Sequence, residues 1–262
     1  MIGISGRDTW YVFCLGGVPM DKIRKLKEMI ADSNRIVFFG GAGVSTESGI
    51  PDFRSKDGLY NQVYKFPPEY MLSHSCFESM PDEFYRFYKD KILLKGILPN
   101  KGHLALAKLE EQGKLSCVVT QNIDHLHEMA GSKTVYHLHG TIMTNHCPTC
   151  GSVYSLEELE QKLELSMVPK CDKCGVIIKP DVTLYEEMLP DDAWNSSMAA
   201  VGDADMLIIC GTSLTVYPAA YIVEYFKGKY LVIINRDATP KDDKAHLVIH
   251  ESFGEVMARV VE

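Results

Sequence analysis

A glycine-rich segment follows a short apolar run near the start of the chain. The apolar run covers residues 35–39, and the segment GAGVSTESGIPDFR covers residues 41–54. An apolar strand that ends in such a turn is typical of a phosphate-binding loop, because glycines let the backbone approach a pyrophosphate closely. Thr46 replaces the third glycine of the usual dinucleotide fingerprint. In addition, no strand that ends in an acidic residue follows about 20 residues later. We therefore predict a dinucleotide that is used in some way other than routine hydride transfer.

Four cysteines form two paired hooks in the middle of the chain. Cys147 and Cys150 form the first C-x-x-C hook, Cys171 and Cys174 form the second, and residues 151–170 lie between them. Each hook can give two thiolates to one tetrahedral ion, and four thiolates fill the coordination shell of zinc. We therefore predict one structural zinc ion per chain. Redox-active cysteine pairs and an iron–sulfur site are the alternatives, and the coincidence of two matched pairs argues against redox activity.

Polar turns follow three expected strands. They comprise Gln121, Asn122, Ile123 and Asp124 after the first strand, Gly211, Thr212 and Ser213 after the second, and Asn235 after the third. Ligand sites of open α/β sheets lie at the carboxyl ends of strands. These amides, hydroxyls and carboxylates are suited to phosphate, ribose or carboxamide groups. Ordinary polar turns or helix caps are the alternative.

Two histidines, His137 and His139, stand at alternate positions before Gly140. On a strand both would face the same side. Histidine titrates near neutrality and is the most common general base. A single histidine is more often packed or solvated, but the position of these two between the polar turn at 121–124 and the cysteine hooks favours catalysis.

The apolar pattern predicts the elements that position these residues. Helical spacing predicts helices over 21–33, 82–94, 103–112, 191–201, 219–226 and 252–261. Apolar runs predict strands over 36–39, 115–119, 205–210 and 230–235. Alternating strands and helices are typical of a doubly wound α/β sheet, and residues 141–183 interrupt this alternation as an insertion would.

The composition of the 262 residues limits the class of protein. Apolar residues make up 46% and charged residues 24%, and the formal net charge is −8. This charge argues against a broad nucleic-acid surface, which needs clustered Lys and Arg. No apolar run approaches the roughly 20 residues that span a bilayer. The spacing of the eight cysteines does not indicate a disulfide framework, so we expect the chain to reside in the reducing cytoplasm. Residues 1–20 are expected to be an N-terminal extension, with a signal peptide as the alternative.

Taken in chain order, the motifs resemble those of the sirtuins, the NAD-dependent protein-lysine deacylases. The resemblance runs from about residue 21 to the end of the chain and is closest to bacterial and archaeal deacetylases. It rests on the glycine loop, QNID at 121–124, LHG at 138–140, the cysteine hooks, GTSL at 211–214 and the turn at Asn235. It implies a Rossmann-like NAD-binding domain formed by residues 21–140 and 184–262, with a small zinc-ribbon domain inserted at 141–183.

The resemblance also implies residue roles. His139 would be the catalytic base, and Asn122 would order the ribose and nearby water. Val182, Leu184 and Tyr185 would pair with the substrate peptide as an added strand. The implied NAD contacts are Gly41, Ala42, Gly43, Thr46, Asp52, Phe53, Arg54, Gln121, Asn122, Ile123, Asp124, Gly211, Thr212, Ser213, Asn235 and Phe253.

The implied reaction consumes NAD. The amide oxygen of an acyl-lysine attacks the ribose carbon as nicotinamide leaves, which forms an imidate. His139 then takes a proton from a ribose hydroxyl, which attacks the imidate carbon, and water completes the transfer. The products are free lysine, nicotinamide and an O-acyl-ADP-ribose. The expected partners are therefore acyl-lysine proteins or peptides.

Several residues depart from the family pattern. His125 stands where Gly is frequent, His137 where Glu is frequent, and Glu186 where a cleft turn usually has Gly. Desuccinylating members carry a Tyr-x-x-Arg pair that binds an acidic acyl group. In this chain Tyr85 is followed three residues later by Tyr88, which replaces the arginine. We therefore expect neutral acyl groups and weak activity on succinyl-lysine.

Two alternatives to deacylation remain. A mono-ADP-ribosyltransferase or NAD glycohydrolase would use the same site and would release nicotinamide without an acyl-lysine peptide. A non-enzymatic zinc-ribbon binding module is the other alternative. The NAD-binding motifs and the net charge of −8 argue against that module.

Overall fold

The computed structural model describes residues 19–52, 58 and 65–261. The predictions for Phe53, Arg54 and residues 1–18 therefore lie outside the described residues. No helix in the described ranges combines the length and the apolar character that a membrane crossing requires.

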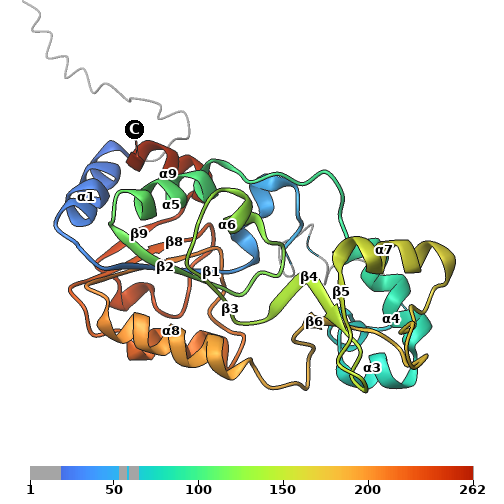
Figure 1. Cartoon of the computed structure of the whole chain (residues 1–262). Coiled ribbons are helices and arrows are strands. Elements are labelled where there is room, and N and C mark those ends of the chain that lie inside the picture. The colour runs from blue at the N-terminus through green and yellow to red at the C-terminus, as the bar shows by residue number, and fades with distance from the viewer. Residues whose placement is uncertain (1–18, 53–57, 59–64, 262) are drawn as a thin grey trace, which may run out of the picture.

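A six-stranded parallel sheet forms the larger part of the molecule (Figure 1). Its strand order is β3-β2-β1-β7-β8-β9. The bounds are β1 Ile36–Gly40, β2 Leu115–Thr120, β3 Val135–His137, β7 Met206–Cys210, β8 Tyr230–Ile234 and β9 Leu247–Ile249. Strand β2 lies on one side of β1 within the sheet, and β7 lies on the other side of β1. This reversal is the topological switch point at which open α/β sheets bind ligands.

Helices cover both faces of this sheet. Helices α1 (Met20–Ala31), α5 (Lys101–Glu111) and α9 (Phe253–Val261) cover one face, and α8 (Asp191–Asp203) and η5 (Ala219–Tyr225) cover the other (Figure 1). Alternate strand residues point to opposite faces, so Phe38 packs in the first core and Phe39 in the second. Burial on both faces explains why the strands are almost continuously apolar.

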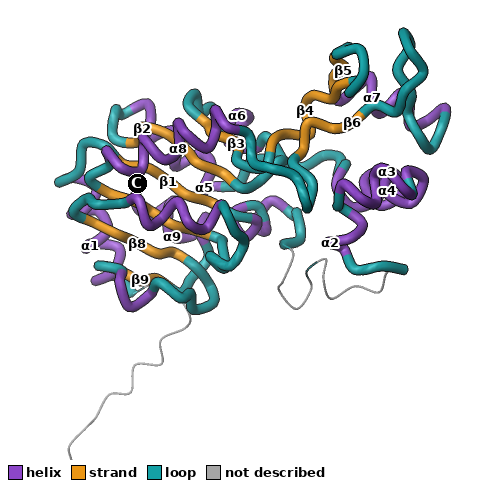
Figure 2. The backbone as a smooth tube through the Cα atoms, turned by 90° about the horizontal axis from the view of Figure 1, so that it is seen from below, coloured by secondary structure: helices purple, strands orange, loops and turns teal. Residues whose placement is uncertain are grey.

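A second, antiparallel sheet lies beside the first. Its strands are β4 (Gly140–His146), β5 (Val153–Ser155) and β6 (Lys179–Val182), and α7 (Leu156–Leu165) follows β5. Figure 2 shows this sheet next to α2 (Pro68–Met71), α3 (His74–Ser79) and α4 (Pro81–Phe87). One apolar cluster joins Phe84 and Tyr85 to Leu159 and Ile178. We call residues 66–94 and 140–184 the small lobe. The narrower zinc-binding domain expected from the sequence, residues 141–183, stays a prediction.

Most predicted elements are confirmed within two residues at each end, and two differ. The helix expected over 82–94 changes from α4 to a π-helical turn, η4 (Tyr88–Ile92). The segment expected as an α-helix over 219–226 forms 3-10 turns instead. Both departures arise in short segments, where apolar spacing alone does not distinguish one kind of helix from another. The remaining short elements are η1 (Ala42–Val44), η2 (Thr46–Ser48), α6 (Leu126–Met129) and η6 (Asp242–Lys244).

Candidate functional site

A cavity of about 720 Å³ opens where the carboxyl ends of the sheet strands face the small lobe. It brings together every predicted site residue outside the cysteine hooks that the structure describes. These are Gly41, Ala42, Gly43, Thr46, Asp52, Gln121, Asn122, Ile123, Asp124, His139, Val182, Leu184, Tyr185, Gly211, Thr212, Ser213, Asn235 and Phe253. Residues far apart in the sequence therefore form one site, as the strand order requires.

The glycines after β1 and β7 allow two loops to touch. The Gly43 N–H donates to the Gly211 carbonyl at 2.8 Å. A Cβ atom on Gly43 would lie 2.7 Å from the Gly211 Cα, and Gly211 itself has a φ of 60°. Side chains here would push the loops apart. The short turns η1 and η2, rather than one long helix, follow the glycines.

Ser45 connects the glycine loop to the turn after β2. Its hydroxyl accepts from Asn122 Nδ2 at 3.0 Å and donates to Asp124 Oδ2 at 2.6 Å. Burial raises the pKa of Asp124, although its hydrogen bonds with Ser45 and the Leu126 N–H oppose that rise. The sequence predictions missed Ser45. Its place in the glycine loop, one residue before Thr46, was the available signal.

His139 is arranged as a neutral base. Its Nδ1 lies 2.9 Å from the Gln121 carbonyl oxygen. A carbonyl can only accept, so Nδ1 carries the hydrogen and Nε2 keeps the lone pair. Burial lowers the pKa of His139, and the bond to Gln121 partly opposes this. A neutral imidazole with a free Nε2 can take a proton from a substrate hydroxyl.

His137 is placed differently. Strand β3 ends at His137, so His139 lies beyond the strand that was expected to hold both rings. The Nε2 of His137 is hydrogen-bonded to the Glu128 carboxylate. His139 lines the cavity, whereas His137 packs behind the turn after β2.

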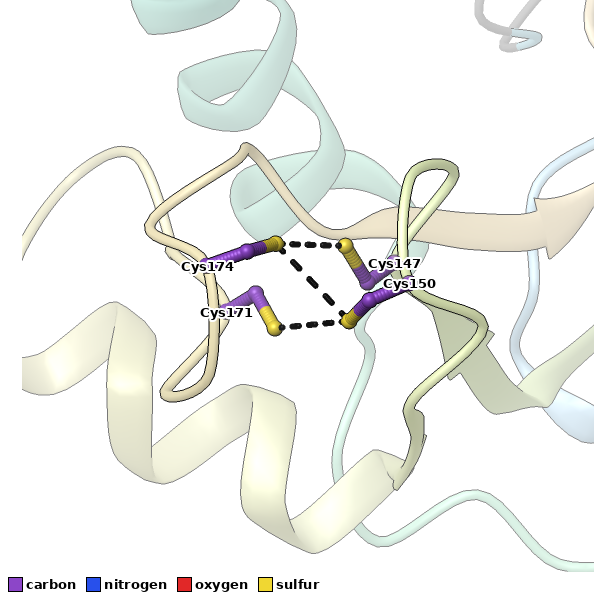
Figure 3. A group of neighbouring side chains, drawn as sticks. All are labelled: Cys147, Cys150, Cys171 and Cys174. Carbon is purple, nitrogen blue, oxygen red and sulfur yellow. Dashed lines mark hydrogen bonds between the residues drawn. The ribbon is translucent and has the colours of Figure 1, made fainter.

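The four hook cysteines form a single cluster, as Figure 3 shows. All four Sγ atoms lie within 4.8 Å of one another, and contacts of 3.3, 3.5 and 3.7 Å connect them. Zinc–sulfur bonds of about 2.3 Å place the sulfurs of a tetrahedral site roughly 3.8 Å apart. The cluster therefore fits one zinc ion held by four thiolates.

Glycines shape both hooks. Gly151 has a φ of 69° and Gly175 a φ of 74°, and their N–H groups donate to the carbonyls of Cys147 and Cys171 at 2.9 Å. The same left-handed turn thus closes each C-x-x-C loop. The four sulfurs converge because the two hooks have the same local geometry.

The segment from Val182 to Tyr185 crosses the mouth of the cavity. The Thr183 N–H donates to the His139 carbonyl at 2.9 Å, and the Tyr185 N–H donates to the Leu72 carbonyl at 3.0 Å. Glu186 follows with a φ of 78° and accepts from the N–H and hydroxyl of Ser75 at 2.9 and 2.7 Å. These hydrogen bonds lower the pKa of Glu186. The segment is thus held in place beside the proposed base.

Comparisons with known proteins agree with this geometry. The Sir2 family model matches residues 41–218. An NAD-dependent protein deacetylase of Clostridium perfringens (strain 13 / Type A) is 56% identical over 245 residues, covering 92% of this chain and 99% of the relative.

Two solved structures are similar to the whole fold. A Sir2 variant with a deacetylated p53 peptide and 3'-O-acetyl ADP ribose is 40% identical, with a TM-score of 0.85, and the match covers 91% of this chain and 97% of that one. A Sir2 with a p53 peptide and NAD+ is also 40% identical over the same shares, with a TM-score of 0.82. The predicted resemblance is therefore confirmed: this chain belongs to the Sir2 family.

Proposed function

We propose that this chain removes acetyl and other neutral acyl groups from protein lysines and consumes NAD in doing so. The observation that carries this proposal is His139, whose Nδ1 is bonded to the Gln121 carbonyl so that Nε2 keeps its lone pair, in the same cavity as both glycine loops. The named activity of the Clostridium perfringens relative supports it. So do the peptide, NAD+ and acetyl ADP ribose in the titles of the similar structures.

Each part of the site has a role in this reaction. The loops at 41–43 and 211–213 hold the pyrophosphate, because their glycines let the backbone approach it closely. Ile123 and Asp124 hold the nicotinamide carboxamide, and Asn122 orders the ribose. His139 takes the proton of a ribose hydroxyl, a step that typically contributes about 10²–10⁴-fold to the rate. Phe53 and Arg54 complete the NAD site in this proposal.

The cysteine cluster has a structural role. None of its four residues, all within the described part of the chain, lines the cavity. Four thiolates leave zinc no open position for substrate. The zinc-bound lobe instead places β4, which directly follows His139, and β6, which ends at Val182.

Part of the cavity lining is apolar, which suits a neutral acyl group. Leu72, Ile92, Ile142 and Val182 are among these lining residues. Lys91 also lines the cavity but lies 2.9 Å from the Asp90 carboxylate. We therefore expect acetyl and propionyl groups to be preferred over succinyl.

The remaining assignments follow from the same proposal. Residues 21–140 and 184–262 form the NAD-binding domain, and residues 141–183 form the zinc-binding domain. We place the chain in the cytoplasm, because the hook thiols must stay reduced to bind zinc. Direct nucleic-acid binding is not expected at a net charge of −8.

Peptides that carry acetyl-, propionyl- or succinyl-lysine, assayed with NAD, test the proposal. We expect nicotinamide release to require an acyl-lysine peptide and His139→Ala to lower kcat by about 10²-fold or more. The control His246→Ala, outside the cavity, should retain activity. Peptide-independent release would favour the glycohydrolase alternative, and near-normal turnover by His139→Ala would overturn the base assignment.

A further inference from the structure

The two histidines that depart from the family pattern meet at one carboxylate. Glu128 lies in α6, and its Oε1 is hydrogen-bonded to His137 Nε2. Its Oε2 lies 3.3 Å from His125 Nδ1. Only 24% of the Glu128 side chain and 20% of the His137 side chain are exposed. The two departures are therefore parts of one cluster, which we call the Glu128 cluster (His125, Glu128 and His137).

The second nitrogen of His137 faces another acceptor. Its Nδ1 lies 3.5 Å from the carbonyl oxygen of Asn122. A neutral imidazole has one N–H and one lone pair, so it can donate to only one of these two acceptors. The other nitrogen would then turn a lone pair toward an oxygen. Only the imidazolium donates to both the Glu128 carboxylate and the Asn122 carbonyl.

We propose that His137 is a positioning residue, held as an imidazolium by Glu128, that fixes the Asn122–Asp124 turn for catalysis. This inference rests on the proposed function, since the turn it positions is the one assigned to ribose and nicotinamide. The Asn122 side chain and Asp124 already share Ser45, so a shift of the Asn122 backbone would move all three groups.

The charges around the ring support the imidazolium. Burial lowers the pKa of His137, but the hydrogen bond and charge of Glu128, with the nearby Asp124, raise it above 6.5 overall. Burial raises the pKa of Glu128, yet His137 holds it below its usual range. His127, the other titratable neighbour in α6, is neutral because burial lowers its pKa to about 3.

Opposite protonation states of His137 and His139 define a pH window. Burial lowers the pKa of His139 below the usual histidine value, so the base becomes available as pH rises through that lowered pKa. The pKa of His137 is raised above the usual histidine value, so the ring loses one of its two donated contacts as pH rises through that higher pKa. The rate should therefore be bell-shaped in pH, with His139 responsible for the acid limb and His137 for the alkaline limb.

Two measurements on the full chain test this inference. The pKa of His137, read from the NMR signals of its labelled imidazole, should lie above 6.5 and should fall by about one to three units in Glu128→Gln. The alkaline limb of kcat/KM for acetyl-lysine peptide should move down with it, while the acid limb stays in place.

Substitutions of His137 separate charge from mere packing. His137→Arg, always charged, should keep activity and lose the alkaline limb. His137→Gln should lose about 10-fold or more below the alkaline limb and progressively less above it, where His137 is itself neutral. The control His246→Gln should leave both limbs unchanged. A His137 pKa below 6.5, or an alkaline limb that Glu128→Gln does not move, would overturn the inference. Because NMR does not depend on activity, failure of the proposed function would be seen separately.

Discussion

The parallel sheet and the small lobe are stabilised in different ways. Every residue of β1 and β7 is buried, between two apolar cores. The strands of the small lobe are more exposed, and their lobe contains a cluster of four cysteines. The sheet is thus held by apolar burial along its whole length, whereas the small lobe combines one apolar cluster with a metal site.

The difference matters because the proposed catalytic base lies where the two parts join. His139 immediately precedes Gly140, the first residue of β4, and Val182 of β6 pairs with Gly140. The sheet positions the NAD loops, and the small lobe positions both the base and the proposed peptide-binding segment. Loss of zinc should therefore affect catalysis without disturbing the sheet.

Removal of zinc should have the largest effect. Structural zinc sites typically contribute about 10–16 kcal/mol to the folding of small units. In Cys171→Ser we expect zinc content to fall from one per chain to nearly none, with deacetylation abolished. Amide exchange should become fast in β4–β6 and stay slow in β1 and β7. Cys76→Ala, a buried small-lobe cysteine outside the cluster, should retain zinc. Equal loss of protection in β1 would contradict the proposed independence of the sheet.

A core substitution in the sheet should have the next largest effect. Ile208 is fully buried in the central strand β7. Ile208→Ala removes apolar contacts and leaves a cavity, so we expect the free energy of unfolding to fall by about 2–5 kcal/mol, whether or not zinc is present. Urea unfolding measures this change in the free energy of unfolding. Val153→Ala, at a strand residue that is 68% exposed, should change stability little. A loss that depends on zinc would show that the two parts unfold together.

Tyr154→Phe should weaken the metal site by a smaller amount. The Tyr154 hydroxyl donates to Cys171 Sγ at 3.2 Å and accepts the Asp172 N–H at 3.0 Å. Loss of such a supporting hydrogen bond typically lowers metal affinity about 10–100-fold. Competition with a chromophoric chelator measures this loss, and the exposed Tyr221→Phe is the control. Unchanged zinc affinity would show that the ring, rather than the hydroxyl, supports the site.

Glu186→Gly should have the smallest effect. Glycine removes the cost of a φ of 78°, but the substitution also removes the two hydrogen bonds from Ser75. Because these changes oppose each other, we expect the Tm to change by no more than about 4 °C. Any kinetic change should appear in KM for the peptide rather than in kcat. A large fall in kcat would place Glu186 closer to the reaction than its contacts indicate.

Local spacing made much of this molecule predictable. The C-x-x-C hooks, the glycines after β1 and the polar turns after β2 and β7 were all identifiable before the fold was known. Their signals depend on residues within a few positions of one another, which share a turn whatever the rest of the chain does. The confirmed helix and strand bounds have the same origin, because periodicity is a local property.

The sequence alone determined the fold class and the Sir2-family motifs, and it predicted the four-cysteine cluster, since each follows from short-range spacing. Only the tertiary structure decided that Ser45 joins Asn122 to Asp124 and that His125 and His137 share Glu128. Those contacts depend on which strands lie side by side and where each one ends. Burial lowers the pKa of both His137 and His139, and the contact with Glu128 raises that of His137 overall. Both effects arise from the same packing, so no local pattern could have predicted them.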